Sequence, residues 1–174
     1  MTSKPSYNPN MFVGELSSKD LEFLTSSPSP QPNRAISHTY APGSTFKVIT
    51  ALAALEHGKV DLGTRFFCTG KDPASAKSCW TVERGRGHGT LDIIGGISES
   101  CNIVFYELGR RVGIDDLAET ARMFGLGQST GITMFPRDQT GLVPDRAWKI
   151  RNFKGYDQRW YPLETLDVAI GQGA

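Results

Sequence analysis

Hydrophobic residues recur at helical spacing between Ser44 and His57, a stretch that contains neither glycine nor proline. Alanines occupy much of the remaining surface of this predicted helix, and a helix that is apolar nearly all round is a buried one. Gly58 follows directly and is typical of a helix end. The predicted apolar stripe consists of Val48, Ile49, Leu52 and Leu55.

The same spacing predicts shorter helices elsewhere in the chain, joined by irregular segments. Further helices are predicted over residues 16–24, 92–98, 101–112 and 115–124, and a short strand over residues 130–134. Loops are predicted for most of residues 1–43, 59–90 and 135–165. Aromatic side chains near the end of the chain are expected to pack as a satellite cluster: Trp148, Phe153, Trp160 and Tyr161.

Composition places the chain among ordinary globular proteins. Of its 174 residues, 39% are hydrophobic and 21% are charged, which is enough for one domain with a hydrophobic core. The formal net charge of +1 predicts no broad attraction to nucleic acid or to an anionic membrane. No stretch approaches the roughly 20 apolar residues that a membrane helix needs, and no secretory signal opens the sequence. Any anchor or export signal is therefore expected outside this chain.

Ser44 and Lys47 form an S-x-x-K motif at the first turn of the predicted buried helix. Residues three positions apart share a helical face, so the Lys47 amine is predicted to reach the Ser44 hydroxyl. Burial lowers the pKa of a lysine and favours a neutral amine that can act as a base. The free N–H groups at the helix start favour negative charge beside Ser44. Together these features predict an activated serine nucleophile.

Ser100 and Asn102 form an S-x-N motif, in which the hydroxyl could relay a proton and the amide could hold a substrate backbone. The motif by itself is weak, because Ser6 and Asn8 match it as well. An alternative interpretation of Ser100 is a cap of the helix that is predicted to follow it.

The order of the two motifs is that of penicillin-recognising serine enzymes. The sequence around them resembles the class B penicillin-binding proteins, and within that family it is most similar to the elongation type, penicillin-binding protein 2. The similarity runs from about residue 4 to the end of the chain. It is carried by residues 5–10, 40–47, 87–89, 100–109, 124–127, 130–132 and 171–173.

This resemblance implies an α+β fold, the one shared by β-lactamases, DD-peptidases and penicillin-binding transpeptidases. Residues 1–174 would be a partial transpeptidase domain, an N-terminal and mostly helical portion without the C-terminal strands of the sheet. The family's third motif, K-[ST]-G, is missing, since residues 129–131 read Ser-Thr-Gly without a lysine. That motif is expected after Ala174, and a membrane anchor and a pedestal domain before residue 1. The chain alone is therefore expected to be catalytically defective.

The resemblance also implies a reaction, the D,D-transpeptidation of peptidoglycan during cell elongation. Ser44 would attack the penultimate D-alanine of a D-Ala-D-Ala stem peptide, and Lys47 would take its proton. Ser100 would relay a proton to the leaving group, and Asn102 would bind the substrate amide. No cofactor is implied for catalysis. β-Lactam antibiotics would acylate Ser44 in the same way.

Partners and location follow from the same resemblance. The expected partners are peptidoglycan stem peptides, β-lactams and membrane proteins of the elongation complex, with no nucleic acid among them. The parent protein would be anchored in the bacterial inner membrane, with its catalytic domain in the periplasm.

Three other functions stay open from the sequence: a serine β-lactamase, a β-lactam sensor that remains acylated, and a fragment that only binds elongation proteins. A class A β-lactamase needs a glutamate that activates water. Glu164 begins a segment that faintly resembles the corresponding signature. It lies too far after Asn102, however, and the segment ends in Asp167 instead of asparagine.

Cys68, Cys79 and Cys101 are the only cysteines, and an odd number excludes complete intramolecular pairing. With His88 they could supply three thiolates and one imidazole, a closed ligand set for a structural zinc ion. Elongation-type members of the resembled family include proteins that look to have a metal site near the S-x-N motif. A Cys68–Cys79 disulfide, which an oxidising periplasm would permit, and inert buried thiols are the alternatives.

Overall fold

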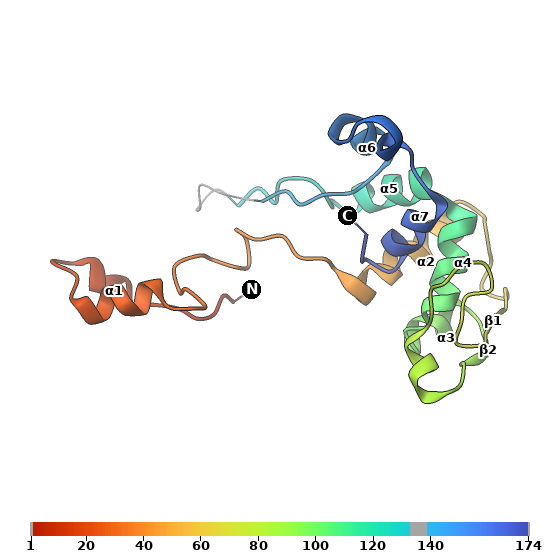
Figure 1. The fold of residues 1–174 in the computed structure, drawn as a ribbon, viewed down its shortest axis with the longest axis horizontal. Coiled ribbons are helices and arrows are strands. Elements are labelled where there is room, and N and C mark those ends of the chain that lie inside the picture. Colours follow the sequence, from red (N-terminus) through yellow and green to blue (C-terminus); the bar gives the residue numbers. More distant parts are fainter. Residues whose placement is uncertain (1, 133–138, 174) are drawn as a thin grey trace. The chain divides into compact units, whose positions relative to one another are not determined.

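The computed structural model describes residues 2–132 and 139–173, which fall into two compact units (Figure 1). The amino-terminal unit comprises described residues up to Tyr40 and between Gln128 and Gly141, and the larger unit comprises the others. The helices are α1 (Ser18–Thr25), α2 (Lys47–Glu56), α3 (Ile93–Ser98), α4 (Asn102–Val112), α5 (Ile114–Met123), α6 (Arg146–Asn152) and α7 (Pro162–Ala169). The strands are β1 (Phe66–Cys68) and β2 (Gly89–Leu91).

The amino-terminal unit contains helix α1 and otherwise mostly irregular, proline-rich chain. Ser17 caps the helix, because its hydroxyl accepts a hydrogen bond from the Asp20 N–H at 3.2 Å while the Asp20 carboxylate accepts one from the Ser17 N–H. The helix predicted over residues 16–24 is thus confirmed. Residues 130–132 do not form the predicted strand, and residues 133 and 134 lie outside the described part of the chain.

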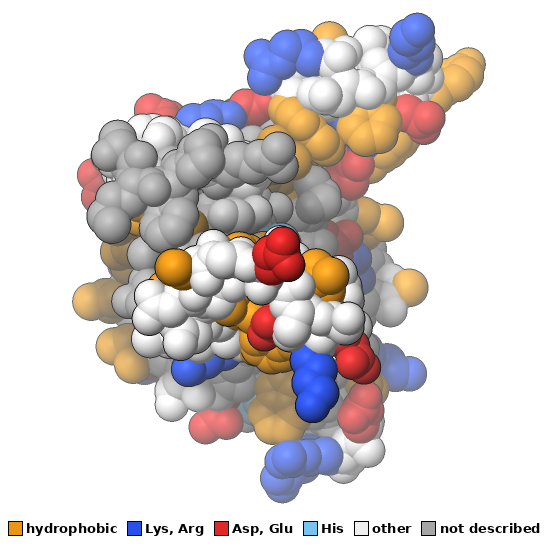
Figure 2. All heavy atoms as spheres, turned by 90° about the vertical axis from the view of Figure 1, so that its left-hand side faces the viewer, with side chains coloured by type: hydrophobic (Ala, Val, Ile, Leu, Met, Phe, Trp, Pro, Cys, Tyr) orange, Lys and Arg blue, Asp and Glu red, His pale blue; other side chains and the backbone are white. Residues whose placement is uncertain are grey.

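The surface carries charges of both signs. Figure 2 shows acidic and basic side chains scattered among polar and hydrophobic ones over one face of the molecule. This distribution agrees with the formal net charge of +1. In the described ranges, no helix is both long enough and apolar enough to cross a membrane.

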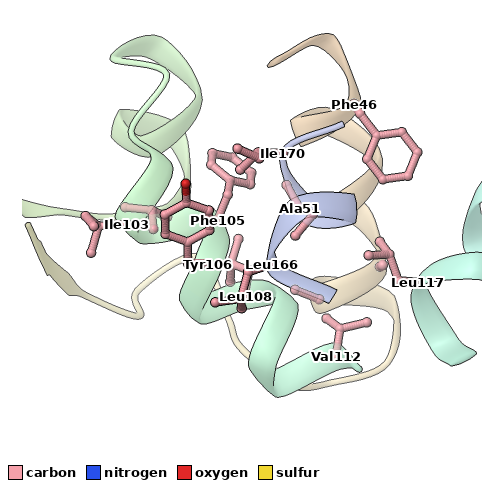
Figure 3. Packing of buried hydrophobic residues seen from close by; sticks show 14 of the residues in the cluster. Phe46, Ala51, Ile103, Phe105, Tyr106, Leu108, Val112, Leu117, Leu166 and Ile170 are labelled. Atoms are coloured by element: carbon pink, nitrogen blue, oxygen red, sulfur yellow. The ribbon is translucent and has the colours of Figure 1, made fainter. Parts of the chain in front are cut away.

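The main hydrophobic core of the larger unit lies among helices α2, α4, α5 and α7. Helix α4 packs against both α2 and α7. Its Phe105 and Leu108 are fully buried, and Figure 3 shows them beside Leu166 of α7. Helices α3, α4 and α5 confirm the three helices predicted between residues 92 and 124, with small shifts at their ends.

Helix α2 forms where the sequence predicts it, but it buries a different face. The predicted stripe was wrong in part, because Val48 is 47% exposed and Leu52 is 39% exposed. The buried face instead carries Lys47, Ala51 and Ala54. Alanine side chains are small, so α4 and α5 pack closely against this face and exclude water from it.

A two-stranded antiparallel sheet forms within the segment that was predicted to be a loop, residues 59–90, and its second strand ends one residue later. Strands β1 and β2 pair antiparallel, with Phe66 opposite Leu91 and Cys68 opposite Gly89. Gly87 lets the chain pass beside β1, because a Cβ there would lie only 2.0 Å from the Cys68 carbonyl oxygen. Strands of three residues are too short to show a recognisable alternation in sequence.

Helices α6 and α7 also correct a loop prediction, that for residues 135–165. Asp145 caps α6 by accepting a hydrogen bond from the Trp148 N–H at 2.6 Å, and Pro162 is the first residue of α7. Length does not explain the difference, because α1 and α3 are as short and were predicted, and Asp145 and Pro162 are helix start signals that the sequence does carry. Helix α7 matters for the site because the chain that follows it returns to Gly43.

Gly109 of α4 faces α7 at a close contact, where an added Cβ would lie 2.7 Å from the Ala169 Cβ. We expect Gly109→Ala to lower the free energy of unfolding by about 1–2 kcal/mol, because overpacking outweighs the gain in helix propensity. Denaturant unfolding followed by circular dichroism measures the change, with the exposed Glu119→Ala in α5 as the control. Unchanged or increased stability of Gly109→Ala would contradict this packing.

Candidate active site

Ser44 lies in a 3-10 turn, Gly43–Phe46, that leads directly into α2. Ser44 is exposed. The chain after α7 contacts this turn: the Gly43 N–H donates a hydrogen bond to the Gly171 carbonyl at 2.9 Å. Gly171 has φ +70°, and a Cβ there would lie 2.3 Å from the Gly43 carbonyl oxygen. Only glycine fits this approach, which explains why residues 171–173 belong with the S-x-x-K motif.

Lys47 is the first residue of α2 and is only 2% exposed. Its Nζ donates three hydrogen bonds: to the Ser100 carbonyl at 2.8 Å, to Ser100 Oγ at 3.0 Å and to Asn102 Oδ1 at 2.7 Å. The ring of Phe105 lies beneath it, with its centroid 5.4 Å from Nζ. The structure therefore brings the S-x-N residues to the amine of S-x-x-K.

Ser100 connects the amine to the exposed serine. Its Oγ donates a hydrogen bond to Ser44 Oγ at 3.0 Å while it accepts one from Lys47 Nζ. The S-x-x-K spacing predicts that the Lys47 amine reaches the Ser44 hydroxyl directly. Within the described part of the chain, hydrogen bonds join the two only through Ser100.

The backbone at Ser100 is in the left-handed region, with φ 48°. This conformation costs a non-glycine residue on the order of 1 kcal/mol, and it turns both the hydroxyl and the carbonyl oxygen of Ser100 towards Lys47. Cys101, not Ser100, is the N-cap of α4, and it makes no side-chain capping bond. The interpretation of Ser100 as a helix cap is therefore wrong.

Burial lowers the pKa of the Lys47 amine below its ordinary value, and this is the largest influence on it. The electrostatic influence of the neighbouring Cys79 and Cys101 acts in the opposite direction and is the smaller effect. The net lowering makes a neutral amine more accessible than for a lysine in water.

Both ends of the Asn102 amide are occupied. Its Oδ1 accepts from Lys47, and its Nδ2 donates to the Ser78 carbonyl at 3.3 Å. Ser78 was missed by the sequence analysis, and no sequence signal could have found it, because every residue carries a backbone carbonyl.

A second group of side chains lies next to the Lys47 site, to which it is joined through Cys101. Cys68, Cys79, His88 and Cys101 each offer a ligand atom, and these atoms all lie within 4.8 Å of one another. His88 Nδ1 is 3.6 Å from the sulfur atoms of both Cys68 and Cys79. All three cysteines are buried free thiols in this structure, which does not contain the Cys68–Cys79 disulfide.

The residues of this cluster fit a tetrahedral metal ion with three sulfur ligands and one nitrogen ligand. Hydrogen bonding with Cys101 lowers the pKa of Cys79, whereas the same interaction and burial raise the pKa of Cys101. A thiolate in such a group is the form that binds a metal. Cys101 stands between Ser100 and Asn102 in the chain, so the cluster and the Lys47 site share one short segment.

The aromatic residues predicted to form a satellite cluster do come together. Trp148 and Phe153 meet edge to face with ring centroids 5.4 Å apart, and with Trp160 and Tyr161 they line a pocket of about 440 Å³. Lys149, which is buried below these rings, forms an ion pair with Glu164.

Comparison with known proteins agrees with this geometry. Residues 1–173 match the family model described as the penicillin binding protein transpeptidase domain. The peptidoglycan D,D-transpeptidase MrdA of Acinetobacter baumannii is 37% identical over 100% of this chain and 26% of the relative. The protein of the same name from Escherichia coli K12 is 38% identical over 99% of this chain and 27% of the relative.

Solved structures give the same result. PBP2 of Pseudomonas aeruginosa in complex with WCK 5153 superposes with a TM-score of 0.87 at 37% identity, over 99% of this chain and 39% of that one. PBP2 of Helicobacter pylori in complex with MreC superposes with a TM-score of 0.87 at 32% identity, over 98% of this chain and 31% of that one.

The chain belongs to the penicillin-binding protein transpeptidase family. Its fold is the penicillin-binding transpeptidase fold, of which it holds a mostly helical part with a small sheet, as the sequence analysis predicted. It spans about a quarter of the length of the curated relatives named above.

Proposed function

We propose that the protein containing this chain is a peptidoglycan D,D-transpeptidase of cell elongation, with Ser44 as its acylated nucleophile. One observation carries the proposal: a continuous hydrogen-bond path runs from Ser44 Oγ through Ser100 Oγ to the buried Nζ of Lys47. A buried base joined to an exposed hydroxyl is what nucleophilic serine catalysis requires. The names of the MrdA relatives support the same activity.

In the acylation step, Lys47 is neutral and both hydrogen bonds reverse: Ser44 Oγ donates to Ser100 Oγ, and Ser100 Oγ donates to Lys47 Nζ. The amine then receives the Ser44 proton through the Ser100 hydroxyl. Ser44 Oγ then bonds to the carbonyl carbon of the penultimate D-alanine, and the electron pair of the carbonyl moves to its oxygen. The Ser44 N–H at the start of the turn helps to hold this oxyanion. Collapse of the intermediate breaks the peptide bond, and the departing D-alanine nitrogen receives the proton back from Lys47 through Ser100.

In the second step, an amino group of another stem peptide attacks the ester carbon. Its proton passes to Lys47 through Ser100 and is returned by the same route to Ser44 Oγ, which leaves as the free hydroxyl when the ester bond breaks. Asn102 keeps Lys47 oriented through Oδ1 and offers the second N–H of Nδ2, the one not donated to Ser78, to the donor peptide. A β-lactam forms the same ester, but its opened ring stays attached, so the amine cannot readily take its place.

The partners and location follow the family. The H. pylori relative is found in complex with MreC, and another structural match, with a TM-score of 0.81, comes from a peptidoglycan synthase complex. For the protein containing this chain we propose a similar assembly, together with stem peptides and β-lactams. Its catalytic domain would work in the periplasm, tethered to the bacterial inner membrane.

A β-lactamase function is disfavoured by the surroundings of Glu164. Its carboxylate pairs with Lys149 and accepts the Tyr161 N–H at 2.7 Å at the start of α7. Both carboxylate oxygens of Glu164 are therefore engaged in contacts that stabilise the start of α7, and neither is placed to activate water.

Ser44→Ala is expected to lower covalent labelling of the full-length protein by a fluorescent penicillin about a thousandfold or more, because the ester oxygen is lost. The label is read by gel fluorescence, and its position by mass spectrometry of the peptide that contains Ser44. Ser98→Ala removes an exposed hydroxyl nearby and should label normally. Persistent labelling of Ser44→Ala at this site would refute the assignment.

The acylation rate is expected to rise with pH and to level off with an apparent pKa below 10.5, the ordinary value for lysine. The sign follows from the lowered pKa of Lys47: raising the pH increases the neutral fraction that can accept a proton. Lys47→Arg keeps the charge but cannot lose its proton, so it should be inactive at every pH. A rate that is flat with pH, or an active Lys47→Arg variant, would count against Lys47 as the base.

We further propose that Cys68, Cys79, His88 and Cys101 bind a structural zinc ion. The support is the burial of the three thiols and the convergence of four ligand atoms from separate segments. His88 binds through Nδ1, and its buried Nε2 faces Glu99 at 4.0 Å, which would fix the ring. The ion would tie β1 and the loop before β2 to the start of α4.

Protein purified without chelator is expected to contain about one zinc ion per chain by elemental analysis. Cys79→Ser should lose it and lower the thermal midpoint, because metal binding is coupled to folding. His38→Ala, outside the cluster, should retain it. Protein that holds no zinc and shows three titratable thiols would contradict the proposal.

A further inference from the structure

A hairpin lies in the chain between β1, which ends at Cys68, and Cys79. Lys71 and Ser78 form an antiparallel bridge, and the Asp72 N–H donates to the Lys77 carbonyl at 2.9 Å. The Cys79 N–H donates to the Gly70 carbonyl at 2.8 Å and closes the base. We call residues 70–79 the 70–79 hairpin.

Two ion pairs hold this hairpin against the helices. On one side, the carboxylate of Asp72 pairs with the guanidinium of Arg110 on α4 and also accepts from Ser75 Oγ. On the other side, Lys77 Nζ lies 2.5 Å from Asp167 Oδ1 on α7. The Asp72 side chain is completely buried. Removing a partner from a buried charge is costly, so the Arg110 contact is a strong constraint on the hairpin.

The hairpin presents one backbone carbonyl to the site. The Ser78 carbonyl accepts the hydrogen bond from Asn102 Nδ2, at 3.3 Å. An amide side chain has a donor end and an acceptor end. With Nδ2 directed to Ser78, Oδ1 must face Lys47 Nζ, to which it lies at 2.7 Å.

We propose that Arg110, through Asp72 and the 70–79 hairpin, is a positioning residue that fixes the orientation of the Asn102 amide towards Lys47. This inference rests on the proposed acyl-transfer function and adds a residue remote from the S-x-x-K and S-x-N motifs. If the hairpin moves, the Asn102 amide loses its anchor and can turn its donor end to Lys47. Lys47 then loses one of its three acceptors and its fixed direction towards Ser100.

The chain offers a matched control on the same turn of α4. Arg111 is adjacent in sequence and pairs with Glu107 at 2.9 Å, and among the described residues no hydrogen bond or ion pair joins it to the hairpin. Arg110→Gln and Arg111→Gln therefore remove the same charge from the same helix. Only the first releases Asp72.

The experiment measures acylation of the full-length protein by a fluorescent penicillin, well below the thermal transition of each variant. We expect Arg110→Gln to slow acylation about tenfold and Arg111→Gln to leave it within about twofold of the unsubstituted rate. Each substitution is repeated in an Asn102→Ala background. If Arg110 acts through Asn102, its further effect there should fall below about twofold, since the pathway is already broken.

A merely structural role predicts a different pattern. If Arg110→Gln slows acylation equally in both backgrounds, it does not act through Asn102, and the inference is overturned. Equal rates for Arg110→Gln and Arg111→Gln would overturn it as well. Either result leaves the labelling of Ser44 intact and so spares the proposed function. If the unsubstituted protein is not labelled at Ser44, the proposed function fails and this inference with it.

Lys77→Gln is the second variant, to be used if Arg110→Gln does not fold. It releases the hairpin from Asp167 without unpairing a buried carboxylate, because Asp167 is 36% exposed. The same loss of rate, again abolished in the Asn102→Ala background, is expected. Lys71→Gln is its control, since Lys71 lies in the same hairpin and its side chain makes no ion pair among the described residues. A normal rate for Lys77→Gln would then overturn the inference.

Discussion

The burial of the Lys47 amine is the interaction on which the rest of the site depends. A lysine amine loses much of its hydration at 2% exposure, and the protein has to replace that hydration with its own acceptors. Ser100 supplies two of them and Asn102 the third. The left-handed backbone of Ser100 is the local cost of directing two oxygens at one nitrogen. The same arrangement leaves the Ser100 hydroxyl donating to Ser44, so the contacts that replace the hydration of Lys47 also reach the proposed nucleophile.

Residues outside the two motifs stabilise both halves of this arrangement, the turn that carries Ser44 and the segment that carries Ser100 and Asn102. Gly171, after α7, supports the turn that carries Ser44 through a contact that admits no side chain. The cysteine cluster and the 70–79 hairpin support the other half, since Cys101 separates the two S-x-N residues and Ser78 accepts from Asn102. Alternate residues of one segment thus face the Lys47 amine and the proposed metal centre. A change in the cysteine cluster or in the 70–79 hairpin should alter the contacts of Lys47, because all three residues of the segment 100–102 take part in these interactions.

The helices of the larger unit were predictable to the extent that their apolar residues repeat over several turns. Helices α4 and α5 satisfy that condition. Length is not the reason that α6 and α7 were missed, since α3 was predicted with only six residues and Asp145 and Pro162 mark the starts of α6 and α7. The face of α2 could not be read from periodicity, since Val48 and Leu52 are apolar yet exposed and Lys47 is polar yet buried. Periodicity reports which side chains avoid water on average, but the neighbouring helices decide which face is covered. Here the face with alanines allows the closer approach.

The sequence by itself determined the chemistry of the candidate site: a serine and a lysine one turn apart, a second serine and an asparagine, and a set of three cysteines with one histidine. Short-range geometry is encoded locally, because a helix places residues three positions apart on one side. Only the tertiary structure decided that Ser100 joins Lys47 to Ser44, and that a backbone carbonyl orients Asn102. These contacts join residues far apart in the chain, and a peptide carbonyl looks the same at every position. The reason is physical. The sequence fixes which chemical group each side chain carries, whereas the residues that pack against a side chain determine its orientation.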